Sequence, residues 1–356
     1  MKRVNSMFSS NDRVVVAAAV EETDREDVVD ALRCRDSVLE ALENSGYRAV
    51  PLDISPEDLD NPSLLVKRIT KEHACCVFNL FEGFSKAAFL EVAFAKLLEV
   101  SGVPFTGNRS RALAACLDKK NARTVLRNAG LPVPPGTCIC SMSERERLEG
   151  LSFPLFVKPR CEDSSVGVDS ESVVQDQSKL EQVLRHRLEE FPQGVIVEEY
   201  LHGEECNASC MGIWPYDFLA MSRILYRPEK GTSDFLGYDS KWRPESVDYR
   251  EIESRVEEGV PSRLQYVIKD MAIRAGAAMS CDGYFRVDFR ERDGKWYVLE
   301  VNPNPDINTD SGFARQSEAA GYSYRLMVAK LVELAVERGD HGVHHNIGPK
   351  RRIAVH

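Results

Sequence analysis

The sequence lacks any long apolar segment. No apolar run approaches the roughly 20 residues that a helix needs to span a membrane. Residues 1–12 are polar and lack the apolar core of a signal peptide. We therefore expect no membrane partner and a cytoplasmic location.

An excess of positive charge is also missing. The chain has 46 Lys and Arg against 56 Asp and Glu, so its formal net charge is −10 at pH 7. Because a nucleic-acid partner usually requires a basic face, we expect none. A nucleotide ligand is not excluded, since it needs only a few local cations.

The cysteines form no metal-binding pattern. None of the ten lies in a CxxC spacing, which argues against a zinc site. Most lie in apolar stretches, as Cys75 and Cys76 do, which is typical of reduced thiols that pack as small hydrophobic residues. Cys161 lies in a small-residue loop instead, where a redox-sensitive thiol is the alternative to a packing residue.

The size and composition of the chain are those of a globular protein with more than one unit. Its 356 residues, 43% of them hydrophobic, predict two or three packed units. Near the N-terminus, expected strands at 13–20, 49–53 and 74–80 alternate with expected helices at 36–44 and 85–100. Such alternation predicts a parallel α/β layer.

The remaining sequence predicts more helices than strands. Strands are expected at 155–158 and 195–200, and helices at 110–117, 119–129, 179–190, 262–279 and 318–336. Prolines at 132, 134 and 135 stop one of these helices and mark a domain boundary. Residues 226–248, rich in Gly, Pro, Asp and Ser, predict a long mobile loop that could act as an active-site lid. The tail 341–356 has no apolar periodicity and is expected to fray.

Two polar clusters suggest contacts with a nucleotide. At residues 156–168 a strand ends at Lys158 and passes into a loop of small residues, whose N–H groups could face phosphate oxygens beside the lysine charge. At residues 197–205 carboxylates follow a strand and could accept from an adenine amino group or ribose hydroxyls. Alone, the first cluster could be a solvated strand end and the second a charged turn.

A third cluster carries more information. Arg286 and Asp288 lie two apart on one expected strand, and Glu300 and Asn302 on the next, so each pair shares a strand face. Charged residues on apolar strands are costly to bury unless they are paired or bind a metal. Oxygen ligands from Asp, Glu and Asn suit Mg²⁺, which commonly bridges nucleotide phosphates. A salt-bridged edge hairpin is the alternative.

The register of the hairpin decides whether this metal site can exist. A strict two-residue turn at Asp293-Gly294 would pair Asp288 with Leu299 and turn Glu300 to the other face. A three-residue turn with a bulge would pair Asp288 with Glu300. We predict the bulged hairpin.

Taken in order, these motifs resemble the D-alanine–D-alanine ligase family of the ATP-grasp superfamily. Residues 103–107, 117–120, 129–134 and 319–324 are similar to segments of that family, and the resemblance covers roughly residues 90–335. It implies an α/β (α+β) ATP-grasp fold in three domains: an N-terminal α/β substrate-side domain at 1–106, a central lid domain with the phosphate-binding loop at 107–205, and a C-terminal ATP- and Mg²⁺-binding domain at 206–340. Residues 341–356 would form a flexible tail.

The resemblance also assigns roles to individual residues. It implies that Lys119 and Lys158 bind the phosphates of ATP, that Glu198 and the backbone near Leu201 meet adenine, and that Glu205 meets ribose. Two Mg²⁺ ions, for which Mn²⁺ could substitute, would be held by Asp288, Glu300 and Asn302. The implied catalytic residues are Arg286, which would steady the transferred phosphate, Ser164 in the closing loop, and Lys241 from the lid. Ser165, in the same loop, would contact ATP.

Departures from the family pattern fall on the substrate side. The glutamate that grips the first substrate's amino group has no clear counterpart; we assign Glu26, with Asp27 as the alternative. Trp242 replaces a tyrosine after Lys241, and an indole N–H can donate but not accept. A histidine–glycine segment is replaced by residues 79–83. Ser311 could receive the second substrate's carboxylate, although acidic residues surround it.

The nucleotide half is therefore intact and the substrate half altered. We expect an ATP-dependent, ADP-forming carboxylate–amine ligase that acts through an acyl phosphate on an amino acid or small peptide. The alternative is a D-alanine–D-alanine ligase proper, which makes D-alanyl-D-alanine for peptidoglycan. A non-catalytic ATP-binding module would be expected to lose the Mg²⁺ ligands or Arg286, and a structural protein would show no response to Mg²⁺–ATP. The family resemblance further implies a homodimer.

Overall fold

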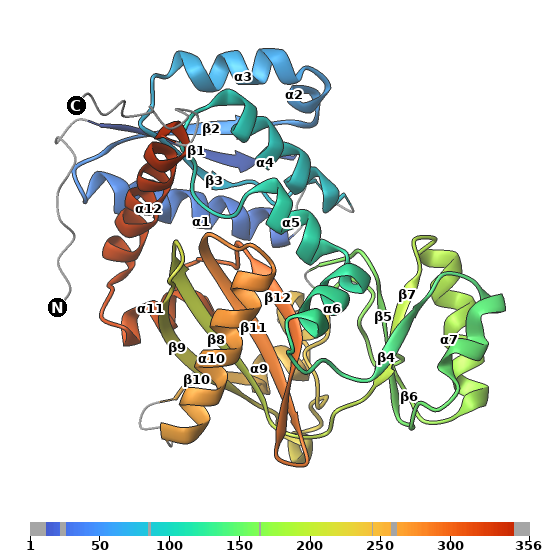
Figure 1. The fold of residues 1–356 in the computed structure, drawn as a ribbon. Helices are drawn as coiled ribbons and strands as arrows, with labels where there is room; N and C mark the ends of the chain where they lie inside the picture. The colour runs from blue at the N-terminus through green and yellow to red at the C-terminus, as the bar shows by residue number, and fades with distance from the viewer. Residues whose placement is uncertain are drawn as a thin grey trace, which may run out of the picture.

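A computed structural model describes residues 12–21, 26–84, 87–163, 165–243, 245–257 and 262–344. The strands form three sheets with helices packed on them (Figure 1). None of the helices within these ranges has both the length and the apolarity needed to cross a membrane. All ten cysteines lie in the described ranges and are free thiols, as expected.

The N-terminal unit contains a parallel sheet of order β2-β1-β3, which confirms the predicted α/β layer. Its strands are β1 (Arg13–Ala19), β2 (Arg48–Ile54) and β3 (Cys76–Leu80). Its helices are α1 (Glu26–Glu43), α2 (Pro56–Asp60), α3 (Pro62–Lys71) and α4 (Phe89–Ser101). Strand β1 lies in the middle and its interior residues are fully buried, as its continuous apolar run requires.

Several helix boundaries differ from those expected in this unit. Helix α1 begins at Glu26 and not at residue 36, because an apolar face that includes the buried Cys34 extends the helix toward its N-terminus. Helix α4 begins at Phe89 and not at residue 85. Helices α2 and α3 were not expected, although Ser55 and Asn61 precede Pro56 and Pro62 in the positions that favour a helix start.

The central unit is a small antiparallel sheet of order β4-β7-β5-β6. Its strands are β4 (Gly136–Ile139), β5 (Leu155–Pro159), β6 (Val173–Val174) and β7 (Val195–Glu199). The helical elements before and within it are α5 (Ser110–Leu117), α6 (Lys119–Asn128), η1 (Met142–Leu148) and α7 (Gln177–Glu190). Helix α7 packs on one face, where Leu155 and Val157 are buried, so Phe156 and Lys158 point to the other face.

The C-terminal unit is a five-stranded antiparallel sheet of order β10-β9-β8-β11-β12. Its strands are β8 (Glu205–Gly212), β9 (Asp217–Leu225), β10 (Glu253–Val256), β11 (Gly283–Arg292) and β12 (Lys295–Pro303). Helix α10 (Ser262–Ala278) covers one face, against Phe285, Val287 and Phe289. The alternate residues of β11, Arg286, Asp288 and Arg290, therefore lie on the opposite face, where they line a cavity together with Phe156 and Lys158 of the central sheet.

The β11–β12 hairpin has the predicted pairing but not the predicted turn. Asp288 pairs with Glu300 and Phe289 with Val298, so Leu299 is the extra residue of a bulge. Arg292 pairs with Lys295, which leaves a two-residue turn in which Asp293 and Gly294 both have positive φ, at 54° and 77°. The prediction of a three-residue turn was wrong. The bulge lies inside strand β12, so the turn can keep its favoured two-residue form.

The lid segment is more ordered in secondary structure than the expected long loop. It contains η2 (Pro228–Lys230) and the short helices α8 (Asp239–Trp242) and α9 (Val247–Glu251). Ser246 caps α9 by accepting from the Tyr249 N–H. The composition of residues 226–248 predicted the irregular backbone of this segment but not the short helices within it.

The single helix expected at residues 318–336 is replaced by two helices in the structure. Helix α11 (Gly312–Ala319) ends before Gly321, and α12 (Tyr324–His344) follows. Gly321 adopts a φ of 89°, which ends a helix and separates the two. Helix α12 includes residues 341–344 of the expected tail, and the rest of the tail lies outside the described residues. The domain bounds stay a prediction.

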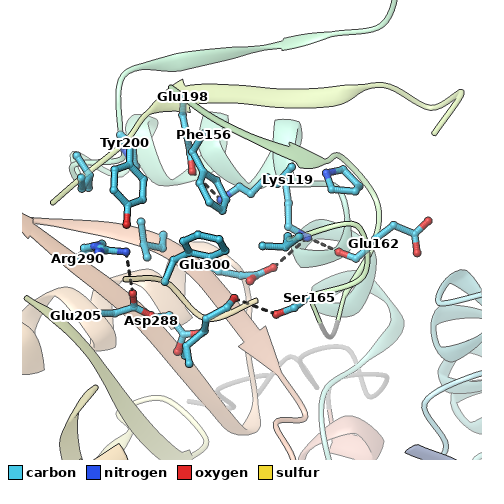
Figure 2. A pocket seen from close by; sticks show the side chains of 18 of the residues that line it. Lys119, Phe156, Glu162, Ser165, Glu198, Tyr200, Glu205, Asp288, Arg290 and Glu300 are labelled. Atoms are coloured by element: carbon cyan, nitrogen blue, oxygen red, sulfur yellow. Dashed lines mark hydrogen bonds and ion pairs between the residues drawn. The ribbon is translucent and has the colours of Figure 1, made fainter. Parts of the chain in front are cut away.

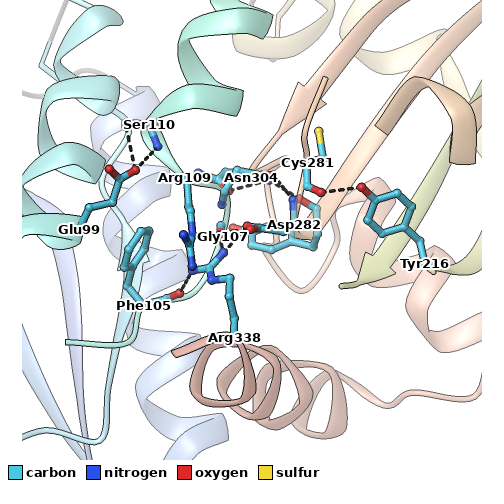
Figure 3. A network of polar contacts seen from close by, with 12 residues as sticks. Glu99, Phe105, Gly107, Arg109, Ser110, Tyr216, Cys281, Asp282, Asn304 and Arg338 are labelled. Atoms are coloured by element: carbon cyan, nitrogen blue, oxygen red, sulfur yellow. Dashed lines mark hydrogen bonds and ion pairs between the residues drawn. The ribbon is translucent and has the colours of Figure 1, made fainter. Parts of the chain in front are cut away.

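A buried arginine ties α12 to the junction between the N-terminal and C-terminal units (Figure 3). Arg338 donates to the backbone carbonyl oxygens of Phe105 and Gly107 and pairs with Asp282, just before β11. Asn108 adds two bonds across the same junction, to the Tyr284 carbonyl and from the Asp282 N–H, each 2.7 Å. The position of β11 relative to the N-terminal sheet therefore depends on this network.

Replacing Arg338 by alanine should destabilise the protein. The substitution leaves two buried carbonyl oxygens without their donor and leaves Asp282 with only its 3.7 Å pairing to Arg109, so we expect a loss of about 3 kcal/mol in the free energy of unfolding. Urea denaturation measures it. Arg185→Ala, at an exposed position on α7, is the control and should change stability by less than about 0.5 kcal/mol. Equal effects of the two variants would contradict the proposed role of Arg338.

Candidate nucleotide and metal site

A cavity lies between the central sheet and the open face of the five-stranded sheet. Figure 2 shows side chains from both sheets pointing into it. Most of the site residues expected from the sequence line this cavity: Lys119, Lys158, Ser165, Glu198, Leu201, Glu205, Lys241, Arg286, Asp288 and Glu300. Segments far apart in the sequence thus meet at one place.

One end of the cavity is lined by aromatic side chains, and we call it the aromatic slot. Phe156 of β5 and Tyr200 stack with ring centroids 6.0 Å apart, and Phe235 of the lid meets Phe156 edge-on at 5.5 Å. Leu299, the bulge residue, lines the cavity as well. Flat apolar walls of this kind suit a planar ring, because aromatic pairs favour stacked and edge-on contacts.

The other end holds cations that are paired with carboxylates. Lys119 lies in the first turn of α6, with its Nζ 3.1 Å from Glu300 and donating to the Glu162 carbonyl. Lys158 Nζ lies 2.8 Å from Glu198 Oε1. The second Glu198 oxygen pairs with Arg123 of α6, so both oxygens of this buried carboxylate are engaged. Glu198 therefore fixes Lys158 in the cavity wall, and its contact with adenine stays a prediction.

Arg290 and Tyr226 complete a buried group around Glu205. Glu205 accepts from Tyr226 Oη at 2.7 Å and pairs with Arg290 Nη1 at 3.3 Å. The Arg290 guanidinium stacks over the Tyr200 ring at 4.9 Å. Burial raises the pKa of Glu205, opposed by the charge of Arg290. Arg290, Tyr226 and Arg123 were not predicted from the sequence, although the two-residue alternation from Asp288 along the strand could have indicated Arg290.

The hairpin brings together the residues expected to bind metal. Arg286 donates twice to Asp288, from Nε at 2.7 Å and from Nη2 at 2.9 Å, and Asn302 Nδ2 donates to Asp288 at 2.8 Å. Desolvation acts to raise the pKa of Glu300, but Lys119 and Lys158 outweigh it and the pKa lies below its usual range.

These residues fit a Mg²⁺ site that shares its ligands with a nucleotide. Asp288 and Glu300 are opposed across the hairpin and supply carboxylate oxygens, and Asn302 supplies an amide oxygen. In the described part of the chain no group of three or more His, Cys, Asp or Glu could hold a metal by itself. Mg²⁺ is usually bound by one or two carboxylates together with phosphates, so this donor set matches it.

The phosphate loop and the lid meet at the cavity. Ser165, with a φ of 64°, donates from Oγ to the Leu236 carbonyl at 3.4 Å. Lys241 of α8 lines the cavity, and desolvation together with the Arg286 charge lowers its pKa. Ser164 and the side chain of Trp242 lie outside the described residues, so their expected roles stay predictions.

Cys161 does not have the surroundings of an activated thiol. Desolvation and the nearby Asp118 raise its pKa, whereas a reactive thiol needs a lowered pKa. The interpretation as a packing residue therefore fits the structure better than a redox-sensitive thiol.

The expected substrate residues are less clearly placed. Glu26 is the first residue of α1, and its side chain lies outside the described part of the structure. Ser311 is buried and caps α11, where its Oγ accepts from the Ala314 N–H at 3.1 Å. The hydroxyl proton of Ser311 can still be donated, so a carboxylate contact there stays a prediction.

Comparison with known proteins agrees with this geometry. Residues 125–333 match the family model described as "D-ala D-ala ligase C-terminus". The chain is 30% identical over 311 residues to a protein named D-alanine–D-alanine ligase from Desulforudis audaxviator, covering 86% of this chain and 94% of the relative.

Solved structures share the fold over nearly the whole chain. The D-alanine–D-alanine ligase from Bacillus anthracis complexed with ATP has a TM-score of 0.72 at 20% identity, covering 93% of this chain and 99% of its own. The VanG D-Ala:D-Ser ligase from Enterococcus faecalis has a TM-score of 0.71 at 20% identity, and the match covers 91% of this chain and 99% of that ligase. These likenesses confirm the expected ATP-grasp fold, and together with the family model they show that the chain belongs to the D-alanine–D-alanine ligase family.

Proposed function

We propose that the chain joins the carboxylate of an amino acid or small peptide to a substrate amine, through an acyl phosphate, with ADP and phosphate as products. Family membership makes it an ATP-dependent, ADP-forming C–N ligase that uses Mg²⁺. The observation that carries the proposal is the cavity in which an aromatic slot adjoins Lys119, Lys158, Arg286 and the paired carboxylates Asp288 and Glu300.

The arrangement suits phosphoryl transfer. Positioned cations stabilise the charge that spreads over the transferring oxygens, which is the main catalytic term in such reactions. Lys119 and Lys158 would bind phosphates, and Arg286 would steady the transferred group. Mg²⁺, proposed here as two ions held by Asp288, Glu300 and Asn302, would neutralise charge on the phosphate oxygens when bound. The lid around Lys241 and the loop at Ser164 and Ser165 would exclude water from the acyl phosphate.

A narrower function is the second candidate. The relative from Desulforudis audaxviator is named a D-alanine–D-alanine ligase, which favours D-alanine as both substrates. Against it stand the substrate-side departures, including residues 79–83 in place of a histidine–glycine segment and the acidic residues around Ser311. A homodimer and a cytoplasmic location, expected from the sequence, stay proposals.

Turnover on amino acids separates these candidates. We expect phosphate release from Mg²⁺–ATP in the presence of a matching acid and amine, and none after EDTA is added. The measurement is phosphate release across D- and L-amino acids and small peptides, singly and in pairs, with product masses. A D-alanyl-D-alanine mass from D-alanine alone supports the narrower function. No release with any pair would contradict the ligase proposal.

The two carboxylates should be needed for catalysis. Asp288→Asn and Glu300→Gln each remove a charge that would hold Mg²⁺, so we expect kcat to fall by at least about 100-fold. Asp293→Asn is the matched control, because it changes the same charge at the tip of the same hairpin, where Asn-Gly also suits the turn. Steady-state kinetics measure this. Unchanged kcat in Asp288→Asn would refute the metal assignment.

The aromatic slot should contribute to ATP binding and not to chemistry. Phe156→Ala removes a stacking wall worth about 1.4 kcal/mol, so the KM for ATP should rise about tenfold while kcat changes little. Tyr266→Ala, at a position that is 71% exposed on α10, is the control. If Phe156→Ala lowers kcat and leaves the KM for ATP unchanged, the slot does not hold the base.

A further inference from the structure

Arg290 joins three parts of the molecule at the aromatic end of the cavity. It lies on the face of β11 that lines the cavity, and it is only 4% exposed. Its Nε donates to the Gly203 carbonyl at 3.3 Å, in the connection from the central unit to β8. Its Nη1 pairs with Glu205 of β8 at 3.3 Å (Figure 2). Its Nη2 donates to the Asp234 carbonyl, which belongs to the lid segment, residues 226–248.

The Asp234 carbonyl is the point at which the lid is held. The Tyr200 hydroxyl also donates to this oxygen, at 2.9 Å, so that both of its lone pairs are engaged. Tyr200 follows β7 of the central unit, whereas Arg290 belongs to the five-stranded sheet. We call this carbonyl and its two donors the lid anchor. Phe235 and Leu236 come next in the chain and line the cavity, so the anchor determines where the lid enters it.

Aromatic contacts extend the lid anchor into the slot. The Arg290 guanidinium lies 4.9 Å from the centroid of the Tyr200 ring and 5.6 Å from that of Tyr226, the first residue of the lid segment. Phe235 is buried and meets Phe156 edge-on. Contacts with two rings and three acceptors leave the guanidinium little freedom, because each restrains its plane in a different direction.

The rest of the lid is tied to another loop and not to a sheet. Ser165 Oγ donates to the Leu236 carbonyl at 3.4 Å, and the Tyr238 N–H donates to the Val168 carbonyl at 3.0 Å. Both partners belong to the phosphate loop. Bonds between two loops do not fix either loop against the sheets that enclose the cavity. The bond from Arg290 does so, because its donor stands on a central strand of the five-stranded sheet.

We propose that Arg290 is a positioning residue that holds the lid over the reacting end of the cavity, so that water does not reach the acyl phosphate. The inference rests on the proposed ligase function. Arg290 would act through Asp234, from which the lid continues to Lys241 in the cavity wall. Water that reaches an acyl phosphate returns the carboxylate and releases phosphate and a proton, so ATP is consumed without ligation. A lysine could pair with Glu205, but only the fork of a guanidinium reaches all three acceptors at once.

Hydrogen exchange tests the lid anchor without turnover. Wild type, Arg290→Lys and Arg290→Met are compared with Mg²⁺, both with and without a non-hydrolysable ATP analogue, and exchange is followed by mass spectrometry in peptides from residues 226–243. Arg290→Met keeps the apolar stem and removes every donor, whereas Arg290→Lys keeps the charge without the fork. Exchange in these peptides should rise at least about tenfold in Arg290→Met and less in Arg290→Lys, while β11 and α10 keep their protection.

Arg292→Met is the matched control. Arg292 lies two residues farther along β11, pairs with Glu199 at 2.6 Å and stacks over Tyr297, and both of these partners lie outside the lid. Its loss should leave exchange in the lid unchanged. Equal exchange in wild type and both Arg290 variants, or an equal rise in Arg292→Met, would overturn the proposal. A rise that extends to β11 and α10 would overturn it as well, because Arg290 would then only stabilise the sheet.

The yield of amide for each ATP consumed connects the lid anchor to the reaction. With the acid and amine that the amino-acid panel identifies, phosphate released is compared with amide formed. The ratio should be close to one in wild type and Arg292→Met and at least about threefold higher in Arg290→Met, with Arg290→Lys between them. Faster lid exchange with an unchanged ratio would overturn the role in excluding water and leave the ligase function standing. Faster lid exchange in a protein that ligates no pair would reject the proposed function and support Arg290 as the lid anchor.

Discussion

The pairing of Asp288 with Glu300 across the β11–β12 hairpin is the constraint on which the rest of the site depends. Side chains alternate between the two faces of a strand, so a shift of one residue would turn Glu300 toward α10 and away from the cavity. The bulge at Leu299 provides that one residue. It places Glu300 opposite Asp288, brings Asn302 within 2.8 Å of Asp288, and leaves Leu299 as part of the cavity wall.

Around this pairing the cavity matches each cation with a carboxylate. Lys119 is paired with Glu300, Lys158 with Glu198, Arg286 with Asp288 and Arg290 with Glu205. Such pairing is required because an uncompensated charge is costly to bury. Under the proposed function, nucleotide binding would exchange these partners: phosphates would pair with the cations, and the carboxylates would become available to Mg²⁺.

Much of the site could be predicted from the sequence because its residues lie on regular strands. Two-residue spacing was enough to put Arg286 with Asp288 and Glu300 with Asn302, and a strand end followed by small residues identified Lys158. The position of the bulge could not be predicted, because the Asp293-Gly294 turn does not determine the strand register: a bulge farther along the strand can change the pairing without changing the turn. Arg123 was missed since its partner, Glu198, is distant in the sequence.

The fold was less predictable where polar residues are buried. No strand was expected at β8 or β9, because Asn207, Ser209 and Ser222 interrupt the apolar pattern there. In the structure Gln316 of α11 donates to Asn207 and Ser222, so polar contacts stabilise this face. Helices α2 and α3 were missed for a different reason: their starts are local capping signals, which apolar periodicity does not detect.

The central claim is that the substrate carboxylate receives the terminal phosphate of ATP before the amine attacks. Isotope transfer tests this claim directly: the carboxylate substrate is labelled with ¹⁸O, and the phosphate released during ligation is analysed by mass spectrometry. An acyl phosphate predicts one ¹⁸O atom in each phosphate released, because the bridging oxygen leaves with phosphorus when the amine displaces it. Unlabelled phosphate at an undiminished rate of ligation would contradict the account, since the phosphate would then have taken its oxygen from water.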